Sequence, residues 1–356
     1  MTKSDLSSQP TTQSFDRDNV MRKILCFGEA LIDFLTSGHN QQGPLNLPVF
    51  CQYPGGAPAN AAVAVARLGG KAYFAGQVSQ DMFGNFLRDA LIAYGVNTSF
   101  LLQHPTASTA LAFVALDDKG ERSFSFHRHQ TADVILRADQ VSDLWFSGDT
   151  ILHFCSNTLT TAAIANCTHA VVAKAKAAGN LISFDVNLRH NLWESGKADR
   201  AVVNPLVAQA DLVKFCRDEL DYLAQGQTEA YIESNLAAGC QLILVTDGAK
   251  PIEYFTQASK GLITPPQVQA VDTTAGGDAF IGGFLYALSG QSDLASLCNQ
   301  PQKLQQLLHF AAHCGAYAVT QPGAFTALPD LAAVKTSLTA QGHSLHDFPS
   351  SLFIGA

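Results

Sequence analysis

Apolar residues occur along the chain in short runs and in longer helical patterns. The short runs predict buried strands, and they lie at residues 71–78, 151–155, 181–186, 212–215 and 242–246. Residues 58–68 and 161–178 have the spacing of helices, which end at Gly69-Gly70 and at Gly179. This alternation of strand and helix predicts a parallel sheet covered on both faces, and hence an α/β fold.

The first apolar run and a later hairpin complete the predicted strands. Residues 22–34 (RKILCFGEALIDF) predict one buried strand with polar residues at its end. Residues 110–117 and 121–128 alternate between apolar and polar positions on either side of Asp118-Lys119-Gly120, as in a β-hairpin. Because no helical segment accompanies this hairpin, we expect it to form a small β-lid on the α/β body.

Composition and charge narrow the class of partner. The chain has 356 residues, 47% apolar and 15% charged, which is typical of a globular protein. A formal net charge of −8 without a long basic run argues against nucleic acid or an anionic membrane as the main partner. Residues 1–20 are polar, as in a flexible tail without a secretion signal, and no apolar run reaches the roughly 18–20 residues of a membrane span. The eight cysteines contain no CxxC pair, so we expect a cytoplasmic protein without disulfides.

The segment 271–285 (VDTTAGGDAFIGGFL) is the most informative for chemistry. Two threonines and two glycines precede an apolar, helix-compatible stretch, and Asp278 falls in its first turn. A helix N-terminus offers unpaired N–H groups and a partial positive charge, which attract phosphate, and glycines let the backbone approach it. A carboxylate beside this anion hole can accept a proton from an attacking hydroxyl. A lone Asp here would be a helix cap, but the TTxGGD context favours catalysis.

Two other polar segments are candidates for ligand contacts. GGAPAN at residues 55–60 leads into a predicted helix, and alone it would be an ordinary turn. DVNLRHNLW at residues 185–193 follows a predicted strand, and alone it would be a surface loop. Ligands of α/β sheets gather beyond the carboxyl ends of the strands, and the guanidinium of Arg189 suits phosphate.

These segments resemble the ribokinase-like (PfkB) carbohydrate kinases, from about residue 22 to 330. The segment around Asp278 is similar to the family's DTTGAGDAF, and GGAPAN is similar to its first signature. GEALIDF at 28–34, ERSFSFHR at 121–128 and the DxNxRxxLW pattern resemble fructokinases and 2-keto-3-deoxygluconate kinases. The resemblance implies a ribokinase-like three-layer α/β/α domain with a small β-sheet lid. Its implied boundaries are a tail at 1–20, a kinase domain at 21–330 with a lid from about 33–52 and 105–130, and a C-terminal extension at 331–356.

The resemblance also implies catalytic and sugar-binding residues. Asp278 is the expected base, with the anion hole at Ala275, Gly276 and Gly277 and a positive charge at Arg189. The residues expected to contact the sugar are Asp33, Gly55, Gly56, Asn60, His127, Arg128, Asn187, Arg189 and Asp278. A helix N-terminus lowers the pKa of a carboxyl group, so we expect Asp278 to be ionised at neutral pH.

The implied donor is ATP with Mg²⁺. Expected nucleotide contacts are Lys214, Glu219, Thr246, Gly248 and residues 275–277, with Glu219 organising water around Mg²⁺. Asp272 is expected to contribute to a monovalent-cation site, for which K⁺ is the candidate. The chain departs from the family pattern at Ser79, Cys216, Ala275 and Ala312, and its loop 244–250 is followed by Pro251 in place of a glycine. If position 275 required a positive φ, alanine would cost about 1 kcal/mol there.

The implied activity is ATP-dependent phosphorylation of a sugar hydroxyl, with fructose giving fructose 6-phosphate. 2-Keto-3-deoxygluconate and aminoimidazole riboside are alternative acceptors. A sugar sensor without turnover is an alternative of another class, suggested by the departures, although a sensor has no need of the base Asp278. The family often dimerises through its lids, so a homodimer is expected. His309 and His313 stand four apart on a predicted helix, but without an evident third ligand they favour a structural role over a metal site.

Overall fold

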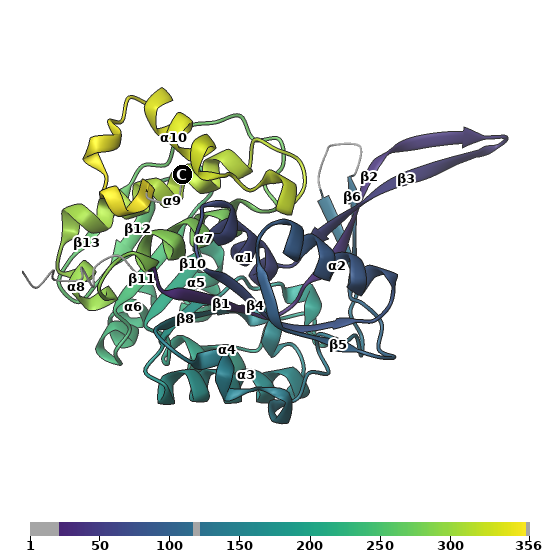
Figure 1. Ribbon diagram of the computed structural model, residues 1–356, viewed down its shortest axis with the longest axis horizontal. Coiled ribbons are helices and arrows are strands. Elements are labelled where there is room, and N and C mark those ends of the chain that lie inside the picture. Colours follow the sequence, from purple (N-terminus) through teal and green to yellow (C-terminus); the bar gives the residue numbers. More distant parts are fainter. Residues whose placement is uncertain (1–20, 117–121, 354–356) are drawn as a thin grey trace, which may run out of the picture.

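The strands form two sheets of different size (Figure 1). In this computed structural model, which describes residues 21–116 and 122–353, the larger sheet has nine strands in the order β13-β12-β11-β10-β9-β8-β1-β4-β5. They are β1 Lys23–Phe27, β4 Ala72–Ser79, β5 Asn97–His104, β8 Thr150–Cys155, β9 Leu181–Asp185, β10 Leu212–Cys216, β11 Leu242–Thr246, β12 Ile252–Phe255 and β13 Lys260–Ile263. From β11 to β5 in this order, neighbouring strands pair in parallel, as predicted. β12 and β13 pair antiparallel, and β13 forms the edge.

Helices cover both faces of the large sheet. They are α1 Ala57–Arg67, α2 Met82–Ala93, α3 Ala162–Ala177, α4 Arg200–Val207, α5 Arg217–Ala224, α6 Thr228–Ala237, α7 Gly276–Ser289, α8 Leu294–Cys298, α9 Pro301–Ala318 and α10 Leu331–Ala340. Successive residues of a strand point to opposite faces. Ile24 and Cys26 therefore join a core with α1, α7 and α9, while Leu25 and Phe27 join a second core with α3 and α4. The predicted three-layer α/β/α fold is confirmed.

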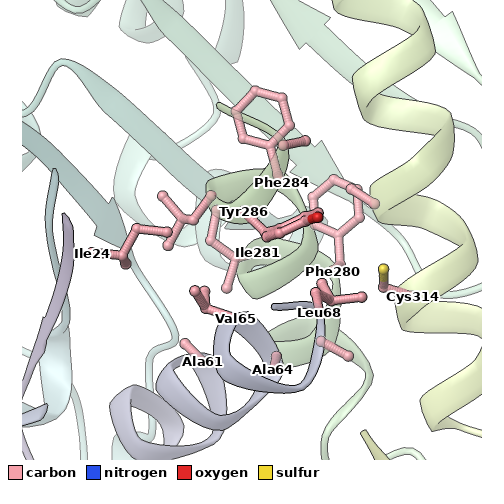
Figure 2. Packing of buried hydrophobic residues seen from close by; sticks show 14 of the residues in the cluster. Ile24, Ala61, Ala64, Val65, Leu68, Phe280, Ile281, Phe284, Tyr286 and Cys314 are labelled. Atoms are coloured by element: carbon pink, nitrogen blue, oxygen red, sulfur yellow. The ribbon is translucent and has the colours of Figure 1, made fainter. Parts of the chain in front are cut away.

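Helices α1 and α7 pack closely within the first core (Figure 2). A Cβ atom at Gly282 of α7 would lie 2.6 Å from the Cβ atom of Ala64 in α1, so glycine permits this approach. The segment after residue 330, expected to be an extension, adds Leu338 and Leu352 to the same core. This packing fixes the N-terminal ends of α1 and α7, from which several predicted site residues project.

The prediction of one strand at residues 22–34 is wrong, because the chain changes sheet within it. β1 ends at Phe27, and β2 begins at Leu31 in the smaller sheet. Gly28 has a φ of +150°, and a Cβ atom there would lie 2.5 Å from Cγ of Pro58. A glycine inside an apolar run is the local signal of such a break. Glu29 and Ala30 therefore connect the two sheets.

The smaller sheet consists of β2 Leu31–Gln42, β3 Leu45–Gly55, β6 Leu111–Leu116 and β7 Arg122–His127. Within the described residues its order is β3-β2-β6-β7, and the predicted hairpin is the antiparallel pair β6 and β7. The β2–β3 hairpin extends away from the large sheet (Figure 1). The small second sheet is thus confirmed, whereas the turn expected at 118–120 and the tail expected at 1–20 lie outside the described residues.

Candidate active site

A cavity of about 360 Å³ lies where the carboxyl ends of β1, β8 and β9 meet the small sheet. Its lining includes Asp33 from β2, Asn60 from α1, Arg189 after β9 and Asp278 from α7. These residues are up to 245 positions apart in the sequence, and the fold brings them together as predicted. The placement follows the general rule that α/β sheets bind ligands beyond the carboxyl ends of their strands.

Asp278 is buried at the first turn of α7. Its Oδ2 atom accepts a hydrogen bond from Nδ2 of Asn60 at 2.7 Å. Burial raises the pKa of Asp278 to about 7, and the nearby charge of Asp185 adds to the rise. The hydrogen bond from Asn60 and the charges of Lys214 and Arg189 oppose this shift without cancelling it. The expectation of a lowered pKa is therefore wrong, since burial outweighs the helix N-terminus.

A second carboxylate, Asp33, faces the same cavity. Its pKa is raised to about 7 by burial and by the neighbouring charge of Asp278. A Cβ atom at Gly55 would lie 2.1 Å from Oδ2 of Asp33, so only glycine leaves room for this carboxylate. Gly56 has a φ of +105°, and a Cβ atom there would lie 2.5 Å from the carbonyl oxygen of Glu29. The two glycines of GGAPAN thus shape the wall beside Asp33.

The loop before α7 is the segment in which the anion hole was predicted. Ala275 is the N-cap residue with a φ of −103°, so alanine carries no left-handed strain, and the conditional penalty at this position does not arise. A Cβ atom at Gly276 would lie 2.6 Å from Val319, and one at Gly277 would lie 3.3 Å from Nζ of Lys214. The first residues of α7 offer N–H groups that have no partner inside the helix. Glycine keeps this end of the helix accessible.

Lys214 brings a positive charge to this loop. Its Nζ atom lies 2.9 and 3.0 Å from the two carboxylate oxygens of Asp185, and both side chains are buried. The pKa of Lys214 is raised because the charges of Asp185 and Glu219 outweigh the effect of burial. Lys214 therefore remains charged next to Gly277.

Glu219 lies in the first turn of α5, and backbone groups hold its carboxylate. Oε1 accepts a hydrogen bond from the amide of Leu188 at 2.9 Å, and Oε2 accepts one from the amide of Cys216 at 2.7 Å. Burial raises the pKa of Glu219, against the charge of Lys214. Cys216 is the N-cap residue of α5, so its departure from the family pattern leaves the cap in place.

A second cavity, of about 250 Å³, lies on the other side of the loop before α7. The predicted nucleotide contacts Thr246, Gly248, Gly276 and Gly277 line it together. Ala312, one of the departures from the family pattern, lines it too. Thr273 borders both cavities. A ligand in one cavity and a ligand in the other would thus meet at the N-terminal end of α7.

The carboxylate of Asp272 holds the loop before α7 through hydrogen bonds with two backbone amides. Its Oδ1 atom accepts a hydrogen bond from the amide of Thr274 at 2.8 Å, and its Oδ2 atom accepts one from the amide of Gly323 at 3.0 Å. The carboxylate thereby connects the loop before α7 to the turn after α9. Among the described residues, no group of three or more His, Cys, Asp or Glu side chains has a geometry suited to a metal ion.

Two residues that the sequence did not single out also line the first cavity. Glu29 is almost fully buried in the connection between the sheets, and it accepts a hydrogen bond from Asn157, which follows β8. Arg128 lies 4.0 Å from Glu29 and 2.6 Å from Asp133, so this predicted sugar contact is also part of a buried ion-pair network. Gly28, which interrupts the apolar run, was the one local sequence signal that could have pointed to Glu29 as a cavity residue. No local signal pointed to Asn157.

His127, His309 and His313 are not among the residues that line the first cavity. The ring of His127 packs edge-on against Phe113, with 5.5 Å between ring centres, while the neighbouring Phe126 lines the cavity. His343 lies 5.6 Å from His309 and 5.5 Å from His313 between ring centres, so a third histidine does approach the predicted pair. His313 bonds to the hydroxyl of Ser337, which is a structural contact.

Comparison with known proteins identifies the family of this chain. A model described as "pfkB family carbohydrate kinase" matches residues 21–331. A fructokinase from Vibrio alginolyticus is 39% identical over 310 residues, which cover 87% of this chain and 96% of that protein. The described residues contain no helix of sufficient length and apolarity to span a bilayer.

The chain is also similar to solved structures of fructokinases. The crystal structure of fructokinase with bound ATP from Xylella fastidiosa is 44% identical with a TM-score of 0.84, covering 91% of this chain and 100% of that chain. The fructokinase from Vibrio cholerae O395, in a form with fructose, ADP and calcium ion bound, is 36% identical with a TM-score of 0.79. It covers 89% of this chain and 99% of that chain.

Proposed function

The chain belongs to the pfkB family of carbohydrate kinases, and from this membership we propose that it phosphorylates fructose with ATP to give fructose 6-phosphate. The similar proteins named above are fructokinases, and the solved structures among them contain ATP, or fructose and ADP. The observation that carries the proposal is the place of Asp278. It lines the first cavity, and it directly follows Gly276 and Gly277, which line the second.

The geometry supports an in-line transfer between the two cavities. Fructose occupies the cavity that contains Asp33 and Asn60, and ATP occupies the cavity that contains Thr246 and Gly248. The sugar hydroxyl attacks the γ-phosphorus, the new O–P bond forms as the bond to ADP breaks, and Asp278 accepts the hydroxyl proton. The N–H groups of residues 275–277, with Lys214 and Arg189, stabilise the negative charge on the transferred group.

Asp278 is suited to this role because its pKa lies near neutrality. With a pKa of about 7, a substantial fraction of Asp278 is ionised at neutral pH, and the ionised form is a stronger base than an exposed aspartate. Burial in the cavity also limits the access of water, which would otherwise compete with the sugar as phosphoryl acceptor.

Metal ions complete the proposal. The donor is Mg²⁺–ATP, in which Mg²⁺ neutralises charge on the phosphates. Glu219 fits an outer role toward water on this ion, because its two oxygens are fixed by backbone amides and each retains a lone pair. Asp272 holds the loop before α7 through the amides of Thr274 and Gly323, so we place the monovalent-cation site, with K⁺ as the candidate, next to this loop.

We also propose a homodimer formed through the small sheet. Leu45, Leu47, Val49 and Phe50 of β3 are exposed large apolar side chains on the extended hairpin. Pairing two such hairpins would remove this surface from water. Light scattering at micromolar concentration tests this point, and a monomeric mass contradicts it.

We place the protein in the cytoplasm. ATP is the proposed donor, and the eight cysteines, which all fall within the described residues, are unpaired. Detection of the activity in a cytosolic cell fraction tests the location.

The central experiment is coupled measurement of ADP release with Mg²⁺–ATP across a panel of acceptors. The panel contains fructose, 2-keto-3-deoxygluconate, aminoimidazole riboside, ribose and glucose. We expect fructose to give the highest kcat/KM and the Asp278→Asn variant to lose about 10²–10⁴-fold in kcat. A preference for another acceptor would replace fructose in the proposal. Sugar binding without ADP release would identify a sensor instead of a kinase.

A further inference from the structure

We propose that the second cavity binds the base of the phosphoryl donor through apolar contacts and not through hydrogen bonds to the edge of the base, so that the protein accepts other purine nucleoside triphosphates besides ATP. This inference deepens the proposed function and rests on it. Of the sixteen described residues that line the second cavity, only Thr246 and Thr273 have side chains that can form hydrogen bonds. The other fourteen are glycine, alanine, proline, valine, isoleucine or phenylalanine, and none of them is charged.

The two threonines contribute little to the recognition of a base. Thr273 borders both cavities in the loop before α7, where the phosphates of the donor are proposed to lie. The hydroxyl of Thr246 already donates a hydrogen bond to the main-chain oxygen of Phe215 at 3.3 Å. A hydroxyl group also rotates and can either donate or accept, so it distinguishes poorly between one base and another.

The backbone around the second cavity is also largely engaged within the protein. The main-chain oxygen of Val319 accepts hydrogen bonds from two amides, at 2.7 and 3.1 Å. Nε2 of Gln267 donates to the main-chain oxygens of Ala249 at 3.3 Å and of Pro265 at 3.4 Å. Pro265 and Pro266 have no N–H group. The wall therefore offers few groups that could distinguish the amino group of adenine from a carbonyl oxygen at the same position.

The second cavity has a buried apolar floor and an exposed apolar rim. Ile252, Phe280 and Ala312 are buried, whereas Ala249 is exposed and Val268 keeps 42% of its surface exposed. A planar base that covers Val268 removes apolar surface of both groups from water, which is favourable. Because the rim is exposed, the polar edge of the base can stay hydrated whichever donors and acceptors it carries. An apolar pocket of this kind discriminates weakly between ligands of similar shape.

The first test compares donors whose bases have nearly the same shape but different edges. Carbon 6 of the purine carries an amino donor in ATP, an acceptor oxygen in ITP and only hydrogen in purine riboside triphosphate. We measure kcat/KM for each as its Mg²⁺ complex, with fructose as acceptor and the full-length chain. We expect the three values to lie within about tenfold of one another, because no hydrogen bond to the edge is lost. A preference for ATP of more than about tenfold over either analogue overturns the inference.

Replacement of Val268 tests the apolar contact itself. We expect Val268→Ser to lower kcat/KM about threefold for ATP and by the same factor for ITP, since the contact does not depend on the edge of the base. Leu262→Ser is the control, because Leu262 is also exposed, at 63%, but does not line the cavity. This control should behave as wild type. A loss in Val268→Ser that is confined to one donor, or no loss at all, contradicts the inference.

Binding without turnover separates this inference from the proposed function. Thermal stabilisation of the protein by Mg²⁺–ADP and by Mg²⁺–IDP requires no sugar. Similar stabilisation by the two diphosphates, without phosphorylation of fructose by any donor, would support the mode of base recognition and contradict the fructokinase proposal. Stabilisation by Mg²⁺–ADP alone, or by neither diphosphate, overturns the inference whichever acceptor the protein uses.

Discussion

The side chain of Asn60 in α1 holds the carboxylate of Asp278 in α7, with 2.7 Å between Nδ2 and Oδ2. The two residues are 218 positions apart, and the close packing of α1 against α7 brings them together. Because the amide can donate to the carboxylate, it favours the ionised form of Asp278. Helix packing thus has a direct effect on the protonation of the proposed base.

The pH dependence of the reaction should follow Asp278. Its pKa is raised to about 7, and only the ionised carboxylate can accept a proton. We therefore expect kcat/KM for fructose to rise about tenfold per pH unit below pH 7 and to level off above it. Initial rates from pH 5 to 9 at saturating Mg²⁺–ATP measure this profile. A flat profile between pH 5 and 7 would contradict the assignment.

Replacement of Asn60 should move the same profile. In Asn60→Leu the hydrogen bond to the ionised form of Asp278 is absent, so the pKa of Asp278 rises and the midpoint moves to higher pH. Asp33, whose pKa is also about 7, is a second group that could produce a midpoint at this pH. The side chain of Asn60 donates its hydrogen bond to Asp278. If the midpoint of the pH profile does not move in Asn60→Leu, the group that titrates is therefore not Asp278.

The ion pair of Lys214 and Asp185 should be important for stability. Lys214→Met leaves the carboxylate of Asp185 buried without its partner, and we expect a loss of about 3–5 kcal/mol in the free energy of unfolding. Urea denaturation monitored by circular dichroism measures it. Lys250→Met is the control, because Lys250 is exposed where it pairs with Asp247, and its loss should stay within about 0.5 kcal/mol. Similar losses in both variants would show that burial does not matter here.

Gly56 should not tolerate alanine. The new Cβ atom would lie 2.5 Å from the carbonyl oxygen of Glu29, in a backbone with a φ of +105°. Gly239 has a similar φ of +118° but no atom within 4 Å of such a Cβ, so Gly239→Ala measures the conformational cost alone. We expect about 1 kcal/mol for Gly239→Ala and at least twice that for Gly56→Ala, from thermal unfolding. Equal losses would mean that the contact with Glu29 relaxes freely.

Ala275 should be a neutral departure from the family pattern. Its φ of −103° suits any residue, so restoring glycine in Ala275→Gly relieves no strain. We expect kcat within about twofold of wild type and a loss of up to about 1 kcal/mol in stability, because glycine has more freedom when unfolded. A large gain in kcat would show that alanine distorts the anion hole.

The order of elements was predictable because it depends on local patterns. Strands such as β8 and β11 and the helices α1 and α3 were expected within a few residues, since apolar runs and terminal glycines mark them. The position of Asp278 in the first turn of a helix was predictable for the same reason, because its motif is continuous in sequence. The break of the apolar run at Gly28 was missed, although the glycine itself was visible.

Features that depend on distant contacts were not predictable. The raised pKa of Asp278 results from burial under several elements, which the local rule for helix N-termini does not include. The hydrogen bond from Asn157 to Glu29 joins residues 128 positions apart. The direction of His127 depends on which face of β7 turns toward the cavity, and a shift of one residue in a strand reverses it.

Thr273 borders both cavities, so a shift of this residue caused by one ligand changes the walls that the other ligand meets. Any coupling between the two substrates that arises in this way is reciprocal. The factor by which bound fructose changes the affinity for ATP must equal the factor by which bound ATP changes the affinity for fructose. Whichever substrate binds first, the ternary complex has the same free energy, and a substitution at Thr273 alters that shared quantity for both substrates together.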